Sequence, residues 1–153
     1  MGDSAGVTEL ELWETHAAEL VRYATLLVGP ADASDVVSVA FGKLRATAQQ
    51  VLHPRRFLLR VVTNVALDQL RSAKRRQRRD LLAALPPLVA EHESHVDIRR
   101  AVADLEVDER AVVYFTYWED LDPVAIAELL GVNPGTVRRR LVRARTRLRK
   151  VLS

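Results

Sequence analysis

The amino-acid sequence predicts an all-α protein with two small helical domains joined by a linker. Along most of the chain the apolar residues recur at steps of three and four, which is the period of a helix. No stretch shows the sustained two-residue alternation that is typical of a strand. Pro86-Pro87 interrupts the helical pattern between the two halves. We place the domains at residues 8–80 and 97–153 and the linker at residues 81–96.

The amino-terminal half contains three predicted helices. They are expected at residues 9–28, from 32 to about 49, and from 55 to about 79. Gly29-Pro30 ends the first helix, Asp32 is the expected N-cap of the second, and Pro54 opens the third. Polar residues of the third helix recur about one turn apart and so share an outer face. They are Arg60, Asn64, Asp68, Arg71 and Arg75. This face fits a salt-bridged surface and a nucleic-acid contact equally well.

Helices resume near Ile98 in the carboxyl-terminal half. Asp108 is expected to cap a helix over residues 109–119, which is rich in large apolar and aromatic side chains. Tyr and Trp in such positions belong to a core more often than to a stacking surface. We therefore expect Tyr117 and Trp118 to be core residues in a helix that packs beneath the segment that follows.

The last thirty residues have the sequence form of a helix-turn-helix. Asp122 and Asn133 are each followed by proline, a pair that caps and starts a helix. Gly131 lies where the first helix needs a left-handed residue to end. The apolar stripe of the second helix is Val137, Leu141, Ala144, Leu148 and Val151. Its other faces are strongly basic, and such a helix can enter a DNA major groove.

Charge is unevenly distributed along the chain. Of 23 Lys and Arg residues, six lie in residues 71–79 and eight in residues 138–150, whereas residues 1–41 hold seven acidic residues and one basic residue. Two basic blocks predict two contacts with a polyanion, and the acidic head predicts a different partner. A membrane-surface or merely solvated helix explains the second block less well. Residues 129–153 contain no acidic residue, and the apolar face there has no aromatic side chain.

Several classes of function are disfavoured by composition. The chain has no cysteine, which excludes disulfides, cysteine-based zinc sites and thiol redox chemistry within it. His92 and His95 have no third ligand, so no metal is expected. We find no phosphate loop, nucleophile motif or paired carboxylates beside a histidine, so we expect neither an enzyme nor a cofactor. Without a membrane-spanning run or a signal peptide, the chain is expected to be cytoplasmic. It is also expected to be a monomer when free.

Three motifs carry a resemblance to a known family. They are L-V-G-P-A-D-A-S-D-V-V-S-V-A-F-G-K-L at residues 27–44, R-x-x-x-N-x-x-x-D-x-x-R at residues 60–71, and G-T-V-R-R-R-L-V-R-A at residues 135–144. With them, residues 12–152 resemble the extracytoplasmic-function (ECF) sigma factors of bacterial RNA polymerase, in the sigma-70 family. The resemblance implies that residues 8–80 are a three-helix sigma domain 2 and that residues 97–153 are sigma domain 4.

The resemblance implies a subunit that binds core RNA polymerase and directs it to specific promoters. Domain 2 would dock on the clamp of the largest subunit and bind the −10 element. Domain 4 would bind the −35 element and the flap of the β subunit. An anti-sigma factor is a further candidate partner. The alternative is a stand-alone helix-turn-helix regulator that never engages polymerase, and a pure protein-interaction module is a third class.

Candidate site residues follow from the resemblance and from helix-turn-helix geometry. For the −35 element they are Asn133, Pro134, Gly135, Thr136, Arg138, Arg139, Arg143 and Arg147. For the −10 element they are His53, Arg60, Asn64, Arg71 and Arg75. For clamp docking they are Asp35, Val36, Val39, Phe41, Lys43 and Leu44. Arg138 and Arg139 suit bidentate readout of guanine, and Arg143 and Arg147 suit phosphate contacts. Arg140 lies close to the apolar stripe and fits a structural role instead.

The sequence departs from the family at three places. Val39 stands where many members have an acidic residue, and the loop at residues 49–53 is shorter than in many members. Phe57 stands where a tryptophan is frequent. We hypothesise that promoter melting is therefore weak or narrowly sequence-dependent. Permanganate footprinting that showed robust opening of a cognate promoter would refute this.

Overall fold

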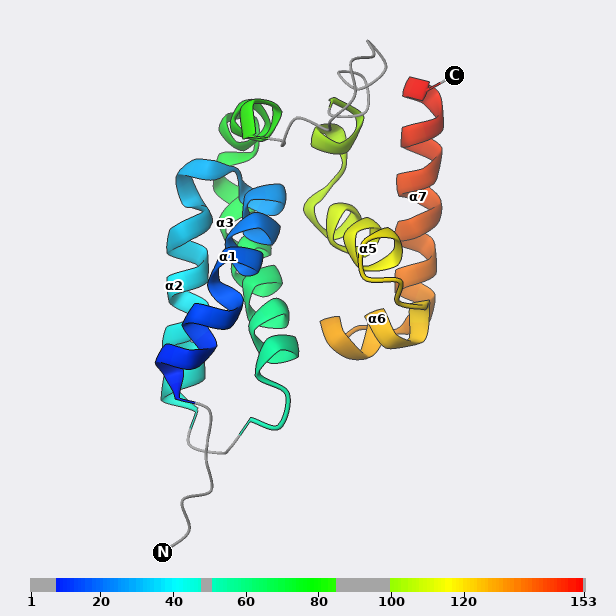
Figure 1. Ribbon diagram of the computed structural model, residues 1–153. Coiled ribbons are helices and arrows are strands. Elements are labelled where there is room, and N and C mark those ends of the chain that lie inside the picture. Colours follow the sequence, from blue (N-terminus) through cyan, green and yellow to red (C-terminus); the bar gives the residue numbers. More distant parts are fainter. Residues whose placement is uncertain (1–7, 48–50, 85–99, 153) are drawn as a thin grey trace, which may run out of the picture.

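The computed structural model describes residues 8–47, 51–84 and 100–152, with side chains described for residues 8–47, 51–69 and 100–150. Within these ranges the chain is helical and contains no strand, as predicted. The helices are α1 (Glu9–Val28), α2 (Pro30–Ala46), α3 (Pro54–Ala84), α5 (Val107–Tyr117), α6 (Pro123–Leu130) and α7 (Pro134–Leu152). Residues 100–104 are also helical. Figure 1 shows α1, α2 and α3 side by side in one bundle, with α5, α6 and α7 in a second group beside it.

The first two helices share a single capping residue. α1 begins with a capping box between Thr8 and Glu11 and ends at Gly29, whose φ of 88° suits glycine. The same Gly29 is the N-cap of α2, and Pro30 occupies the first turn of that helix. α2 therefore begins three residues earlier than a cap at Asp32 predicts. Asp32 is not its cap but an acidic residue in its first turn, where the helix dipole favours a negative charge.

The three amino-terminal helices bury one apolar core. Its fully buried side chains come from all three helices and include Leu20, Leu27, Val36, Val37, Phe41, Leu58, Leu59 and Val62. Tyr23 is buried among them, and its hydroxyl lies 2.7 Å from Thr63 Oγ1. The Trp13 ring packs 4.8 Å from Phe41 but remains 41% exposed. Leu10 is 65% exposed in the first turn of α1.

α3 is longer than the sequence predicted. It continues to Ala84 rather than ending near Arg79, so the first four residues of the predicted linker are helical. Residues 85–99, which include the proline pair, His92, His95 and Ile98, lie outside the described residues.

The carboxyl-terminal helices extend the same hydrophobic core. Phe115 of α5, Ile126 of α6 and Val137 of α7 are fully buried in it. α5 begins at Val107 after an N-cap at Glu106, so Asp108 lies inside the first turn and is not the cap. The caps of the last two helices are as predicted. Asp122 Oδ1 accepts a hydrogen bond from Ala125 N–H at 2.8 Å, and Gly131 has the left-handed φ of 69°.

The prediction of Tyr117 and Trp118 as core residues is wrong. They are 56% and 72% exposed. α5 ends at Tyr117, so the chain turns away before α6 can cover them. Instead the Trp118 ring stacks on Tyr114, with ring centres 6.4 Å apart, and the Tyr117 hydroxyl accepts a hydrogen bond from Arg145 Nε at 2.8 Å.

Candidate nucleic-acid interface

The amino-terminal end of α7 presents two of the predicted base-reading residues to solvent. Arg138 and Arg139 are both exposed on its first turns. Arg139 Nη2 donates a hydrogen bond to Thr136 Oγ1 at 3.1 Å, which restricts the rotamers of the arginine. Two guanidinium groups at the start of a recognition helix lie where base edges are reached in a helix-turn-helix complex.

The turn before α7 is built by the other predicted −35 residues. Asn133 Oδ1 accepts a hydrogen bond from Gly135 N–H at 2.8 Å, so the Asn133 side chain caps α7. A Cβ atom on Gly135 would lie 3.2 Å from that same oxygen, which leaves little room for a larger residue. Since Asn133 is exposed and its carbonyl oxygen is engaged, its NH2 group is the part that a base edge can reach.

Two α7 arginines form ion pairs with α5. Arg140 Nε lies 3.1 Å from Asp108 Oδ2, which supports the structural role expected for Arg140. Arg147 Nη1 lies 3.2 Å from Glu109 Oε1, and the Glu109 side chain is buried. Arg147 was predicted as a phosphate ligand. It also neutralises a buried carboxylate, and this second role was not predicted. Arg143 is exposed and remains the simpler phosphate candidate.

Two neighbouring charges at the start of α5 are buried. Burial raises the pKa of Glu109, and the charge of Arg147 partly offsets this. Burial lowers the pKa of Arg110 to about 10. Arg110 Nη2 donates a hydrogen bond to the backbone oxygen of Leu27 at 3.0 Å. That oxygen belongs to the last turn of α1, so a cation from one domain caps a helix of the other.

The predicted −10 residues lie along α3 and just before it. His53, Arg60, Asn64 and Asp68 are exposed, which agrees with a shared outer face. Arg71 and Arg75 lie within the helical range of α3, but their side chains are outside the described part. The guanidinium of Arg60 lies close to Gly131, in the turn of the helix-turn-helix. A Cβ atom added to Gly131 would lie 2.5 Å from Arg60 Nη2.

The predicted clamp surface of α2 is smaller than the sequence indicated. Asp35, Val39 and Lys43 are exposed, and Leu44 is half-buried. Val36 and Phe41 are buried in the three-helix core, so they hold α2 in place and cannot be docking residues. They share one sequence motif with the exposed residues of α2, and only their burial shows that they belong to the core.

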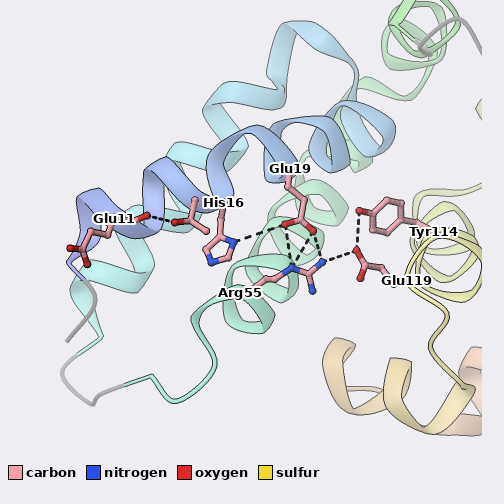
Figure 2. Close-up of polar contacts among 7 residues, drawn as sticks. Glu11, His16, Glu19, Arg55, Tyr114 and Glu119 are labelled. Carbon is pink, nitrogen blue, oxygen red and sulfur yellow. Dashed lines mark hydrogen bonds and ion pairs between the residues drawn. The ribbon is translucent and has the colours of Figure 1, made fainter. Parts of the chain in front are cut away.

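A polar cluster joins the two domains (Figure 2). Arg55 of α3 donates hydrogen bonds to Glu19 of α1, with Nε 3.1 Å from Oε1 and 3.2 Å from Oε2, and it forms an ion pair with that carboxylate through Nη2. Arg55 Nη2 also lies 2.7 Å from Glu119 Oε1, just beyond α5. The Tyr114 hydroxyl donates to the same oxygen at 3.3 Å. Glu19 thereby raises the pKa of Arg55, and burial beside Glu119 raises the pKa of Tyr114 to about 12.

Tyr114 of this cluster also packs against two other aromatic rings. The Tyr23 ring of α1 lies 4.7 Å from Tyr114 and 5.3 Å from Phe115, measured between ring centres. None of Glu19, Arg55 and Glu119 was predicted as a site residue. The Arg55 contacts span 36 and 64 residues of sequence, so no local pattern could have indicated them.

Family models match both halves of the chain. The model of sigma-70 region 2 matches residues 12–76, and the model of sigma-70, region 4 matches residues 95–148. The ECF RNA polymerase sigma factor SigL of Mycobacterium tuberculosis is 32% identical, over 92% of this chain and 86% of its own length. The chain belongs to the ECF family of RNA polymerase sigma factors.

The matches to other sigma factors differ in how much of each relative they span. SigM of Mycobacterium tuberculosis is 36% identical over 63% of this chain, and the match spans about half, 50%, of SigM. Among solved structures, the sigma factor RpoE from Bartonella quintana, in complex with the anti-sigma factor NepR, superposes with a TM-score of 0.63. The identity there is 24%, over 94% of this chain and 95% of RpoE, so the likeness concerns the fold.

The arginine-bearing faces of α3 and α7 fall within different family models. Region 2 includes α1, α2 and the first part of α3, and region 4 includes α5, α6 and most of α7. The described residues contain no cluster of three or more metal-ligating side chains. None of the described helices is long and apolar enough to cross a membrane.

Proposed function

We propose that this chain is a sigma factor that binds core RNA polymerase and directs it to specific promoters, without enzymatic activity of its own. One observation carries the proposal: a region 2 bundle and a region 4 helix-turn-helix occur in the same chain. A stand-alone regulator needs only the second of these. Polymerase would supply the chemistry of initiation, and this chain would supply placement on the promoter.

At the −35 element, Arg138 and Arg139 are the proposed base readers. Both are exposed at the start of α7, and Thr136 holds Arg139 in place. A bidentate arginine–guanine contact discriminates between bases by about 1–3 kcal/mol. Asn133, Pro134 and Gly135 set the angle of α7, with the Asn133 amide as a further donor. Arg143 is the proposed phosphate contact, and Arg147 adds to it while it pairs with Glu109.

At the −10 element, the exposed row of α3 is the proposed contact. Arg60 and Asn64 lie one turn apart on it, His53 precedes it, and Arg71 and Arg75 continue its spacing. On α2, the exposed side chains of Asp35, Val39 and Lys43 are the proposed contact with the clamp of the largest subunit. Region 4 is the proposed contact with the flap of the β subunit.

Family membership also supports an inhibitory partner and a location. RpoE from Bartonella quintana was solved with an anti-sigma factor, and we propose that this chain has a partner of the same class. Since polymerase and promoter DNA lie in the bacterial cytoplasm, we propose that it acts there.

A pull-down with bacterial core RNA polymerase tests the proposal. We expect the purified chain to be retained by core polymerase, and Asp35→Ala/Lys43→Ala to weaken retention. Asp32→Ala/Arg45→Ala is the matched control, since it removes one acidic and one basic side chain from the same helix. Absence of retention, together with tight binding to an inverted-repeat DNA, would favour the stand-alone regulator.

A further inference from the structure

Tyr117 lies at the end of α5 and is hydrogen-bonded to α7, although the two helices meet mainly through buried residues. The Tyr117 side chain is 56% exposed. Its hydroxyl accepts a hydrogen bond from Arg145 Nε at 2.8 Å, and the guanidinium carbon of Arg145 lies 5.8 Å from the centre of the ring. A contact this exposed contributes little to the stability of the fold. What it does determine is the orientation of Arg145.

Tyr117 orients Arg145 without neutralising its charge. A phenol hydroxyl is uncharged at neutral pH, and here it occupies only the Nε donor, so the Nη1 and Nη2 groups of Arg145 remain as a pair of donors. In the described part of the chain no carboxylate pairs with Arg145. Arg147 differs, because its partner Glu109 is a buried carboxylate. Of these two arginines, Arg145 is the one that keeps its full charge for an anion outside the protein.

Arg145 lies in the same row of α7 as the proposed base reader Arg138. Residues seven apart share a helix face, and both arginines are exposed on it. Seven residues of a helix rise about 10 Å. The major groove is about 12 Å wide, so a helix whose start reaches base edges brings a residue two turns later to a strand that borders the groove. Arg145 is therefore placed to meet a phosphate while Arg138 meets a base.

We propose that Tyr117 is a positioning residue that holds Arg145 for a bidentate contact with a phosphate of the −35 DNA. This inference rests on the proposed function of α7 and adds two residues to it. The Nη1 and Nη2 groups can both donate to one phosphate, which is the geometry that guanidinium favours. An arginine that is already oriented loses less rotamer entropy on binding. The contact carries no sequence information, so it strengthens binding to every duplex alike.

Tyr117→Phe tests the orientation alone, because it removes the hydroxyl and keeps the ring. The full chain is titrated, by fluorescence anisotropy, against a duplex that the wild-type chain selects from a random pool and against a scrambled duplex of the same composition. We expect Tyr117→Phe to weaken binding to both duplexes about two- to tenfold, which is the range that ordering one long side chain allows.

Arg145→Ala tests the phosphate contact. It should weaken binding to both duplexes at least as much, and it should reduce the slope of log affinity against log salt concentration by about one. In the Arg145→Ala background, Tyr117→Phe should have no further effect, because the residue through which it acts is gone.

Trp118→Phe is the matched control. Trp118 is the neighbouring exposed aromatic residue, and its ring stacks on Tyr114 of the same helical segment. This substitution should leave affinity for both duplexes unchanged. Tyr117→Phe should also leave the free energy of unfolding unchanged, which separates orientation of Arg145 from a structural role.

The possible outcomes separate this inference from the proposed function. Unchanged binding by Tyr117→Phe, or an equal loss in the Arg145→Ala background, would overturn the positioning role. A salt slope that Arg145→Ala leaves unchanged would overturn the phosphate contact. A wild-type chain that selects no duplex from the pool would overturn both this inference and the proposed −35 face. Retention on core polymerase is measured independently in the pull-down, so a chain that binds polymerase and DNA but does not respond to Tyr117→Phe contradicts this inference alone.

Discussion

The arginines of α7 and those of α3 are used differently by this protein. Arg138, Arg139 and Arg143 of α7 point to solvent, whereas Arg55 and Arg60 of α3 contact the other domain. A basic helix that faces water is available to DNA at all times. A basic helix whose cations touch a second domain is available only when that domain moves. If both helices bind DNA as proposed, α7 provides a permanent binding face in region 4 and α3 a conditional one in region 2.

The largest expected effect is that of Phe115→Ala, because the Phe115 ring packs both in region 4 and against Tyr23 of the other domain. Phe115 is fully buried, and its ring lies 5.3 Å from Tyr23. We expect Phe115→Ala to lower the free energy of unfolding by about 3–5 kcal/mol, because it leaves a cavity. Tyr117→Ala, two residues away but exposed, should cost about 1 kcal/mol or less. Chemical denaturation compares the two, and equal losses would contradict the described core.

The permanent face is tested by removing its base readers. Arg138→Ala and Arg139→Ala should each weaken binding to the −35 duplex by about 1–3 kcal/mol and relax specificity at one base pair. Arg149→Ala removes the same charge near the end of α7 and should weaken all sequences alike. Fluorescence anisotropy with matched and mutated duplexes measures both effects. If Arg149→Ala matched the other two, α7 would bind DNA without reading it.

The conditional face is tested at Gly131. Gly131→Ala should destabilise the chain by about 1–2 kcal/mol because φ at this position is left-handed. An added Cβ also displaces Arg60, so the cost should be smaller in an Arg60→Ala background. A double-mutant cycle by thermal or chemical unfolding measures this coupling. A coupling energy of zero would mean that Arg60 does not touch the turn in solution.

Local features of the fold could be predicted from the sequence. The helix-turn-helix is specified by Asp122, Gly131 and Asn133, whose capping roles depend on near neighbours alone. The cluster around Arg55 could not be predicted, since its partners become neighbours only after the domains pack. The burial of Glu109 and Arg110 could not be predicted either, because charged side chains are almost never fully buried unless they are paired.

The predicted site residues show the same difference between features set by local sequence and features set by packing. The α7 arginines were placed by local spacing, and their exposure agrees with it. Val36 and Phe41 share the motif of the clamp residues but belong to the core, which only the packing of three helices reveals.

The smallest expected effect concerns the ion pairs that hold α7 on α5. Burial raises the pKa of Glu109 in the folded chain, so between its unfolded and folded pKa values the folded state binds more protons. Stability attributable to this group should therefore increase as pH falls through the folded pKa towards the unfolded value of about 4.3. Glu109→Gln should remove that dependence. Unfolding free energies of both proteins, measured from pH 7 down to about pH 4 so that the unfolded pKa is included, test the sign, and identical pH profiles would contradict it.

Transcription reconstituted with core RNA polymerase tests the central claim most directly. The chain is added to core polymerase on a pool of promoter fragments, and transcript start sites are mapped. We expect new start sites that share −10 and −35 sequences and that disappear with Arg138→Ala/Arg139→Ala but persist with Arg149→Ala. Failure of core polymerase to bind the chain or to start new transcripts, while the carboxyl-terminal half still binds DNA, would contradict the account.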